Sequence, residues 1–301
     1  MDFLTKEKLN LALTSEGVFN LLPKRKRDSH KGSYGKAAIM AGSIEYTGAA
    51  FLSAAACLRS GAGYTALFVP SEILSHYILK VPEILLKTSN EGSRYAFKEE
   101  IMGKLREYDA VAYGMGMGVS VDVAEGAAWL LSHYQGKLIL DADGLNSLSV
   151  YKKEGFSSLL KNAKCDVILT PHIKEFSRVS GLPVEEILQD EIGCARAFAE
   201  SNSVTLLLKN AASVITDGEK TAVNSTGNSG QAKAGSGDVL SGVLAGLCAQ
   251  GASGFDGACA AAFLCGKAAE LAAKSVGEYS LTATDCIARL GEAFLSVLGR
   301  A

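Results

Sequence analysis

The stretch Asn224-Ser-Thr-Gly-Asn-Ser-Gly-Gln-Ala-Lys-Ala-Gly-Ser-Gly-Asp238, followed directly by Val239-Leu-Ser-Gly-Val-Leu-Ala-Gly-Leu247, does most to decide the fold. Its first part ends in a glycine-rich turn, and its second part has no proline and no charge, which predicts a buried helix from Val239. Glycines let backbone N–H groups approach an anion closely, and a helix N-terminus adds unpaired N–H donors and the positive end of a dipole. The stretch therefore predicts a phosphate-binding turn at the start of a helix.

Asp238 stands where this predicted phosphate site meets the helix. A carboxylate is repelled by a neighbouring phosphate, so its presence there needs a chemical reason. The interpretation we favour is general-base catalysis, in which Asp238 takes a proton from a hydroxyl that attacks phosphorus. The alternative is an ordinary loop in which an acidic residue simply favours the helix dipole.

Outside this stretch, short apolar runs alternate with helical segments along the chain. The runs are nearly continuous, which is typical of strands that helices cover on both faces. They predict strands at residues 37–41, 64–69, 109–113, 137–141, 166–170 and 204–209, and a hairpin of 213–216 with 221–224. Helices are predicted at 48–61, at 184–201 and through most of the chain after residue 238. The order indicates a single α/β domain with a mostly parallel central sheet and an antiparallel part at the hairpin.

Small or polar residues follow nearly every predicted strand. They are Gly42-Ser43, Gly114-x-Gly116, Asp141-x-Asp143, Thr170-Pro171-His172 and Lys209-Asn210. In open α/β sheets, ligands bind beyond the carboxyl ends of the strands. We therefore expect these residues to converge with the Gly237-Asp238 turn on one ligand site.

Several of these strand ends allow more than one interpretation. Asp143 could cap a helix, or Asp141 and Asp143 together could position other groups or hold magnesium through water molecules. His172 and Lys209 could be structural, or they could contact a ligand, and Lys209 would then face a nucleotide phosphate. The Gly114–Gly118 segment lacks the complete G-x-G-x-x-G fingerprint, so it predicts a tight turn at least as well as a dinucleotide site.

The composition excludes several classes of protein. Of 301 residues, 48% are hydrophobic and 21% charged, with a net charge of −2, which describes a globular chain without a basic field for nucleic acid or anionic membrane. The basic run at residues 24–27 is short and is expected to be solvated. There is no signal-peptide pattern and no apolar run of about 20 residues for a membrane span. Seven cysteines without a C-x-x-C pair predict free thiols in a reducing compartment, and we expect a cytoplasmic protein.

Two common enzyme classes are also excluded by missing motifs. The chain has no G-x-x-x-x-G-K-[ST] sequence, so it is not a P-loop enzyme. It has no G-x-S-x-G sequence either, which argues against an α/β-hydrolase.

Taken together, these segments resemble the ADP/ATP-dependent NAD(P)H-hydrate dehydratase family, a branch of the ribokinase-like superfamily. The matching segments lie in order between about residues 24 and 298. They are Asp28–Gly35, Ala41–Ser43, Tyr46–Ala49, Leu58–Gly63, Gly114–Gly116, Asp141–Asn146, Leu169–His172 with Glu175, Leu208–Lys209 and Asn224–Asp238. The resemblance implies a ribokinase-like fold for residues 24–301, with residues 1–23 as a lead-in segment.

Three details depart from the usual family pattern. The turn carries Ala234 and Ser236 where the family usually has Gly and Thr, Asn210 stands in place of a Gly after Lys209, and Met115 replaces a Pro. None of the three removes a proposed catalytic group.

The resemblance implies an enzyme that repairs damaged nicotinamide cofactor. Such an enzyme phosphorylates the ring hydroxyl of the S-epimer of NADHX or NADPHX, and loss of phosphate then restores NADH or NADPH. The resemblance implies ADP as the donor, with ATP as the alternative, and Mg²⁺ to neutralise the phosphates. It also implies a homotetramer that works with a separate NAD(P)H-hydrate epimerase, because too few residues precede the first strand for the family's epimerase domain.

The same resemblance assigns roles to individual residues. Asp238 would be the catalytic base. The anion hole would consist of the N–H groups of Gly235, Ser236 and Gly237. The hydrated dinucleotide would contact Ala49, Gly116, His172 and Asp238. The adenine nucleotide would contact Lys209, Asn210, Ala211, Ala212, Ser213 and Gly237. No residue is assigned as a metal ligand.

Two other functions are compatible with the same turn. A ribokinase-like kinase of a small alcohol, of the thiazole or pyrimidine type, would share Gly235–Asp238 but has less reason to carry the segments at 30–35 and 170–172. A non-catalytic adenine-nucleotide sensor would bind phosphate better without the Asp238 carboxylate, so the presence of that group favours an enzyme.

Overall fold

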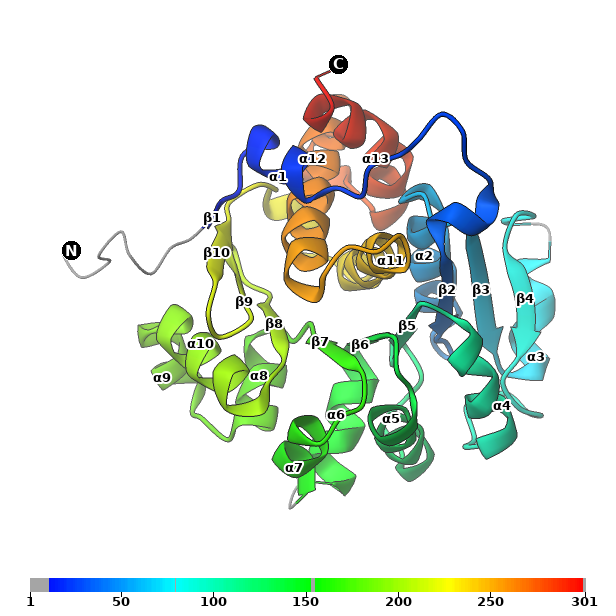
Figure 1. The fold of residues 1–301 in the computed structure, drawn as a ribbon. Helices are drawn as coiled ribbons and strands as arrows, with labels where there is room; N and C mark the ends of the chain where they lie inside the picture. The colour runs from blue at the N-terminus through cyan, green and yellow to red at the C-terminus, as the bar shows by residue number, and fades with distance from the viewer. Residues whose placement is uncertain (1–10, 79, 153–154, 300–301) are drawn as a thin grey trace.

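The computed structural model describes residues 11–78, 80–152 and 155–299, which form one sheet with helices packed against it (Figure 1). Ten strands are assigned in these residues, in the order β1-β10-β9-β8-β7-β6-β5-β2-β3-β4. The antiparallel pairs are β8–β9 and β9–β10, and the other neighbouring pairs are parallel. The strands are β1 (Leu11–Ala12), β2 (Lys36–Met40), β3 (Tyr64–Val69), β4 (Leu85–Thr88), β5 (Ala110–Tyr113), β6 (Lys137–Leu140), β7 (Asp166–Leu169), β8 (Thr205–Leu208), β9 (Ser213–Thr216) and β10 (Thr221–Asn224). The predicted parallel sheet and its antiparallel hairpin are therefore confirmed.

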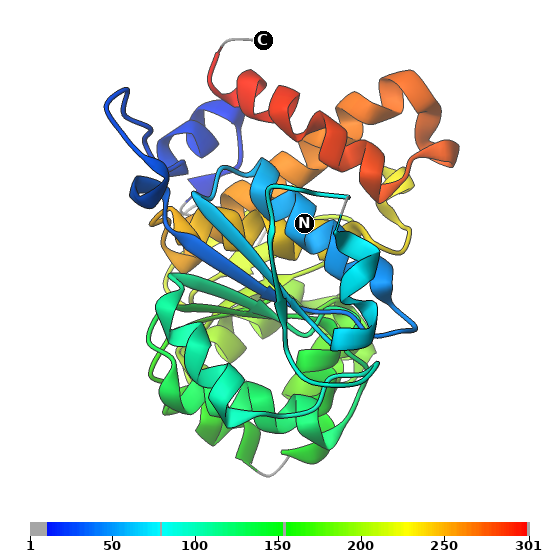
Figure 2. The same cartoon turned by 90° about the vertical axis from the view of Figure 1, so that its right-hand side faces the viewer.

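Helices cover both faces of this sheet, as the side view shows (Figure 2). One face carries α1 (Ser15–Leu21), α2 (Thr47–Arg59), α11 (Ser236–Ala249), α12 (Gly254–Ser280) and α13 (Ala283–Val297). The other carries α4 (Glu99–Lys104), α5 (Val121–His133), α6 (Ala142–Tyr151), α7 (Phe156–Lys161), α8 (Ile173–Ser180), α9 (Val184–Gln189) and α10 (Glu191–Asn202). Shorter elements are α3 (Ser71–Leu74) and the 3-10 helices η1 (Lys31–Tyr34), η2 (Ser75–Tyr77), η3 (Leu105–Glu107) and η5 (Ser229–Gln231).

The alternation of side chains along a strand explains why the sheet has two cores. In β2, Ala37 and Ile39 belong to the core under α2 and α11. Their neighbours Ala38 and Met40 belong to the core on the opposite face. Successive side chains of a strand point to opposite faces, so a strand buried on both sides needs a continuous apolar run.

Helix α11 is fixed in place by close packing against α2. A Cβ at Gly242 would lie 2.1 Å from the carbonyl oxygen of Ser53, and one at Gly246 would lie 2.7 Å from that of Cys57. These two glycines, four residues apart, lie on the same side of the helix and let the two backbones approach closely. The packing holds the N-terminus of α11 at the carboxyl edge of the sheet, where the ligand site is predicted.

The structure corrects the prediction in three places. The helix predicted at 184–201 is two helices, α9 and α10, separated at Asp190. The Asp190 carboxylate accepts a hydrogen bond from the Gly193 N–H at 2.8 Å and so caps α10. An N-cap residue has a non-helical backbone, so α9 ends before Asp190. The buried helix α11 begins at Ser236 rather than at Val239. Strands β1 and β4 were not predicted from the sequence.

Two further expectations can be compared with the described residues. All seven cysteines are free thiols, as predicted. Among the helices in residues 11–78, 80–152 and 155–299, none combines the length and apolar character that a membrane crossing requires.

Candidate active site

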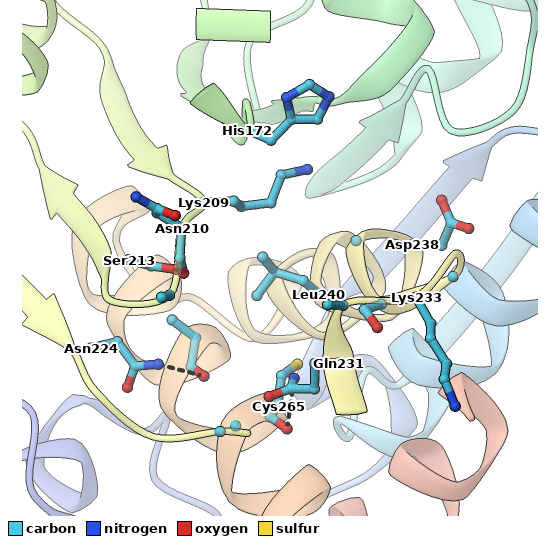
Figure 3. A pocket seen from close by; sticks show the side chains of 18 of the residues that line it. His172, Lys209, Asn210, Ser213, Asn224, Gln231, Lys233, Asp238, Leu240 and Cys265 are labelled. Atoms are coloured by element: carbon cyan, nitrogen blue, oxygen red, sulfur yellow. Dashed lines mark hydrogen bonds between the residues drawn. The ribbon is translucent and has the colours of Figure 1, made fainter. Parts of the chain in front are cut away.

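A cavity of about 1090 Å³ lies at the carboxyl edge of the sheet, between the ends of β6, β7 and β8 and the start of α11. Because these strands are parallel, their ends meet at one edge, and Asp141, His172 and Lys209 all line the cavity. Figure 3 shows His172 and Lys209 on one side of it and Asp238, in the first turn of α11, on the other. The predicted convergence of strand ends with the glycine-rich turn is confirmed at these positions.

The turn before α11 presents unpaired N–H groups to the cavity. Gly235 is the N-cap with φ +98°, a conformation that favours glycine, and no side chain caps the helix. Among the described residues, the N–H groups of Gly237 and Asp238 have no hydrogen-bond acceptor, whereas the Ser236 N–H makes a long 3.4 Å bond to the Lys233 carbonyl oxygen. The free donors next to the positive helix end can bind a phosphate group.

Gly237 brings this turn close to a cation. A Cβ at this position would lie 3.4 Å from the Lys209 Nζ atom. The ammonium group and the free N–H groups therefore face the same part of the cavity, which concentrates positive charge where a phosphate would lie.

Asp141 is buried and all its interactions are internal. Its carboxylate accepts hydrogen bonds from Lys209 Nζ at 2.8 Å, from Ser241 Oγ at 2.6 Å and from the Ala142 N–H at 2.8 Å. It also caps α6, so the helix-capping alternative considered for Asp143 is fulfilled by Asp141 instead. The Asp143 carboxylate instead accepts from the Gly118 N–H at 2.8 Å, which ties α6 to the loop after β5. Asp141 therefore positions Lys209 and Ser241.

Asp238 has the opposite environment. Its carboxylate makes no hydrogen bond and no ion pair with the residues that the structure describes. Its pKa is raised to about 7, chiefly by burial and also by the nearby Asp141 and Asp143 charges, while the Lys209 charge works to lower it. A carboxylate with a pKa near 7 and free oxygens is suited to accept a proton from a substrate hydroxyl.

Lys209 is charged despite its position in the wall of the cavity. Burial works against the charged form, but Asp141, Glu175 and Asp238 outweigh it and the pKa of Lys209 is raised. The Lys209 N–H also donates to the Pro171 carbonyl oxygen at 2.8 Å, which holds the end of β8 beside the end of β7. Lys209 is thus a fixed cation next to the turn.

His172 combines a structural role with a place in the cavity wall. Its Nδ1 accepts from the N–H groups of Lys174 and Glu175 at 3.1 and 3.3 Å, and its own N–H donates to Glu175 Oε2 at 2.9 Å. This reciprocal cap requires an unprotonated Nδ1. Burial lowers the pKa of His172, so the ring is neutral at pH 7 and carries its proton on Nε2, which lies 3.5 Å from Glu175 Oε1.

The remaining predicted residues fall into two groups. Asn210, Ala211 and Ser213 line the same cavity, while Ala212 is exposed and is not part of its wall. Ala49 and Gly116 also lie outside that wall but next to each other, because a Cβ at Gly116 would lie 2.8 Å from the Ala49 Cβ. Of the proposed dinucleotide contacts, His172 and Asp238 therefore line the same cavity as most of the proposed nucleotide contacts, whereas Ala49 and Gly116 lie outside its wall.

Several residues that shape the cavity were not predicted from the sequence. Its inner wall comes from η5 and α12, through Gln231, Cys265 and Gly266. Lys233, two residues before Gly235, points away from Asp238 (Figure 3) and donates to the Tyr279 and Leu281 carbonyl oxygens at 2.6 and 2.8 Å. The asparagine- and glycine-rich run at 224–235 was the available signal for them, because such a loop is expected at the surface, where binding residues often lie.

The side chains around the cavity decide how a metal ion could bind. No group of three or more His, Cys, Asp or Glu side chains that could hold a metal occurs among the described residues. The Asp141 oxygens are already occupied by internal donors. This donor set suits Mg²⁺ that arrives on nucleotide phosphates and keeps most of its water ligands.

Comparison with known proteins agrees with this site. The model of the NAD(P)H-hydrate dehydratase family matches residues 37–290. A bifunctional NAD(P)H-hydrate repair enzyme Nnr of Moorella thermoacetica is 34% identical over 91% of this chain and 52% of its own length. An ADP-dependent (S)-NAD(P)H-hydrate dehydratase of Neisseria meningitidis is 32% identical over 90% of this chain and 88% of its own. The chain thus spans about half the length of the bifunctional relatives it matches.

The fold agrees with that of a solved relative. The ADP/ATP-dependent NAD(P)H-hydrate dehydratase of Bacillus subtilis, co-crystallised with ATP and Mg²⁺, superposes with a TM-score of 0.81 and 28% identity, covering 96% of this chain and 99% of the other. A family model that matches most of the sequence, together with these relatives, leads to one conclusion: the chain belongs to the NAD(P)H-hydrate dehydratase family, with a ribokinase-like fold.

Proposed function

We propose that this protein converts the S-epimer of NADHX or NADPHX back to NADH or NADPH, with ADP as the phosphate donor. The observation that carries the proposal is the unpaired Asp238 carboxylate, with its pKa near 7, beside the free N–H groups at the start of α11. A phosphate site needs no carboxylate, whereas transfer of a phosphoryl group to a hydroxyl needs a base.

In the proposed reaction, Asp238 accepts the proton of the ring hydroxyl as its oxygen attacks the terminal phosphorus of the nucleotide. The bond from phosphorus to the nucleotide breaks, so ADP leaves as AMP. The N–H groups of Gly237 and Asp238 and the Lys209 ammonium stabilise the charge on the transferred phosphoryl group. The ring C–O bond then breaks and phosphate leaves with the electron pair. The neighbouring ring carbon loses its proton to the departing phosphate, and the electron pair of that C–H bond forms the double bond. Mg²⁺ on the nucleotide neutralises the phosphate charges.

The proposal assigns separate sets of residues to the two ligands. Ala49, Gly116 and His172 would contact the hydrated dinucleotide, together with Asp238. Lys209, Asn210, Ala211, Ala212, Ser213 and Gly237 would contact the adenine nucleotide, and the N–H groups of Gly235, Ser236 and Gly237 would form the anion hole. The neutral Nε2–H of His172 makes it a hydrogen-bond donor for this contact.

The partners and the domain division are proposals as well. We expect a cytoplasmic homotetramer that acts with a separate NAD(P)H-hydrate epimerase, and the bifunctional relatives support a link between the two activities. The domain is proposed to comprise residues 24–301, preceded by a lead-in of residues 1–23. In the described part of that segment, β1 pairs with β10 and Val18 of α1 is fully buried.

Phosphorus-31 NMR tests the reaction directly. The purified protein is mixed with NADHX, Mg²⁺ and ADP, and the spectra should show one AMP and one inorganic phosphate for each NADH formed. A kinase of another alcohol would leave NADHX and ADP unchanged in this mixture. ATP in place of ADP gives the donor preference from the relative rates.

A further inference from the structure

Lys209 lies between two carboxylates and is paired with only one of them. Its Nζ is 2.8 Å from Asp141 Oδ1, and it makes no ion pair within 4.0 Å with Asp238. The Asp238 carboxylate nevertheless feels the Lys209 charge, which works to lower its pKa. A movement that brought the ammonium into an ion pair with Asp238 would therefore weaken the base that the proposed reaction needs.

Two contacts hold Asp141 where it can keep Lys209. The Asp141 side chain is 2% exposed, so rotation away from its donors would leave a buried charge unsatisfied. Its Oδ2 accepts the 2.6 Å bond from Ser241, and its Oδ1 accepts from both Lys209 and the Ala142 N–H. The orientation of this carboxylate is thus set by Ser241 on one oxygen and by Lys209 on the other.

Ser241 is well placed to act on Asp238 through this network. It is fully buried, and it follows Asp238 by three residues on α11, so both side chains lie on the same side of the helix. The Ser241–Asp141 bond joins α11 to the end of β6, while the Asp141–Lys209 pair joins β6 to the end of β8. The distance between Lys209 and Asp238 depends on both links.

We propose that Ser241 and Asp141 are positioning residues that hold the Lys209 ammonium away from Asp238, so that Asp238 meets the substrate hydroxyl as a free carboxylate. This inference rests on the proposed function for its catalytic meaning. Neither residue touches the reacting atoms, and both act through Lys209. Asp141 holds Lys209 in an ion pair, and Ser241 orients the Asp141 carboxylate through a hydrogen bond.

The direction of the effect follows from the charges that face Asp238. These are Asp141 from the end of β6, Asp143 from α6 and Lys209 from the end of β8. Both carboxylates disfavour a negative Asp238, and the ammonium favours it. Loosening the Asp141–Lys209 pair moves the ammonium toward Asp238, so the pKa of Asp238 must fall and the base must become weaker.

The test is a carbon-13 NMR titration of the full-length protein labelled at the aspartate carboxyl carbons. The Asp238 signal is assigned by its loss in Asp238→Asn. We expect wild-type Asp238 to titrate near pH 7. Ser241→Ala should lower this midpoint by roughly half to one unit, and Asp141→Asn, which keeps the side-chain shape, should lower it by about two units. Ser60→Ala is the control, because Ser60, at the C-cap of α2, is also a buried serine but donates to the Ala56 carbonyl oxygen.

A parallel assay separates this proposal from the proposed function. If the protein is a dehydratase, the acid limb of kcat should move to lower pH by the same amount in each variant, with plateau kcat reduced about threefold per unit of lost basicity. An inactive wild-type protein would refute the function, while the titration would still decide the arrangement of the three charges. The inference is overturned if Ser241→Ala titrates like Ser60→Ala, or if Asp141→Asn raises the Asp238 midpoint.

Discussion

Two carboxylates at the same edge of the sheet, Asp141 at the end of β6 and Asp238 at the start of α11, have opposite environments. Asp141 accepts three hydrogen bonds, one of them from a lysine, and is buried. Asp238 accepts none from the described residues, and its pKa is raised to about 7 by burial and by its acidic neighbours. The difference shows that the pairing of a carboxylate decides its chemical role, because a paired group positions others whereas an unpaired one is available for proton transfer.

The largest expected effect comes from removing the unpaired carboxylate. Asp238→Asn keeps the shape of the turn and its N–H groups, so nucleotide affinity measured by calorimetry should be retained or improved. Turnover should fall by roughly 10² to 10⁴, the usual contribution of a positioned base. A variant with wild-type turnover would show that Asp238 has no role in proton transfer.

The paired carboxylate should matter for stability instead. Lys209→Met leaves Asp141 buried without its cation, which should lower the free energy of unfolding by about 3 kcal/mol. Adding Asp141→Asn to this variant removes the stranded charge and should restore at least half of the loss. Urea denaturation of both single variants and the double variant measures this, and equal stability of Lys209→Met and the double variant would contradict the pairing.

The pH dependence tests the environment of Asp238. Because its pKa is raised to about 7, kcat/KM should fall about tenfold for each pH unit below 7, where the base is protonated. Between pH 3.8 and about 7, Asp238 is protonated in the folded protein but ionised in the unfolded chain. The free energy of unfolding therefore decreases as pH rises through this range.

Asp238→Asn should therefore be more stable than wild type at pH 8 by up to about 4 kcal/mol, with the difference vanishing near pH 4. Thermal denaturation at a series of pH values measures it. A pH-independent difference between the two proteins would mean that the pKa of Asp238 is not raised.

The smallest expected effect concerns His172, whose roles can be separated by a pair of variants. Asn can cap α8 in place of the imidazole, so His172→Asn should unfold at nearly the wild-type temperature, whereas His172→Ala should lose about 1 kcal/mol. If His172 also contacts the dinucleotide, both variants should raise KM for NADHX by a similar factor. If KM rises only in the destabilised His172→Ala variant and not in His172→Asn, the role of His172 is structural.

Much of the fold could be predicted because its signals are local. The continuous apolar strands, the 213–224 hairpin and the turn at 235–238 each depend on a few adjacent residues. Strand β4 was missed because Leu85–Thr88 is partly exposed and lies at the edge of the sheet, so it carries no buried apolar run. The break between α9 and α10 was missed because the sequence does not distinguish the N-cap residue Asp190 from an acidic residue on the exposed face of one continuous helix.

The sequence could predict which residues lie at the candidate site, but not which of them pair with one another. Residues at the carboxyl ends of parallel strands must lie at one edge, which brings Asp141, His172 and Lys209 together. Which carboxylate receives the lysine depends on contacts between residues 68 and 100 positions apart, those of Asp141 with Lys209 and with Ser241. Such contacts follow from the packing of α11 on α2 and the sheet, and no local pattern in the sequence indicates them.

Absorbance at 340 nm, recorded while the protein acts on NADHX with Mg²⁺ and either ADP or ATP, tests the central claim most directly. We predict growth of the reduced-nicotinamide band that requires nucleotide and is abolished by Asp238→Asn. Folded protein that binds nucleotide but produces no such growth with either donor would contradict the assignment.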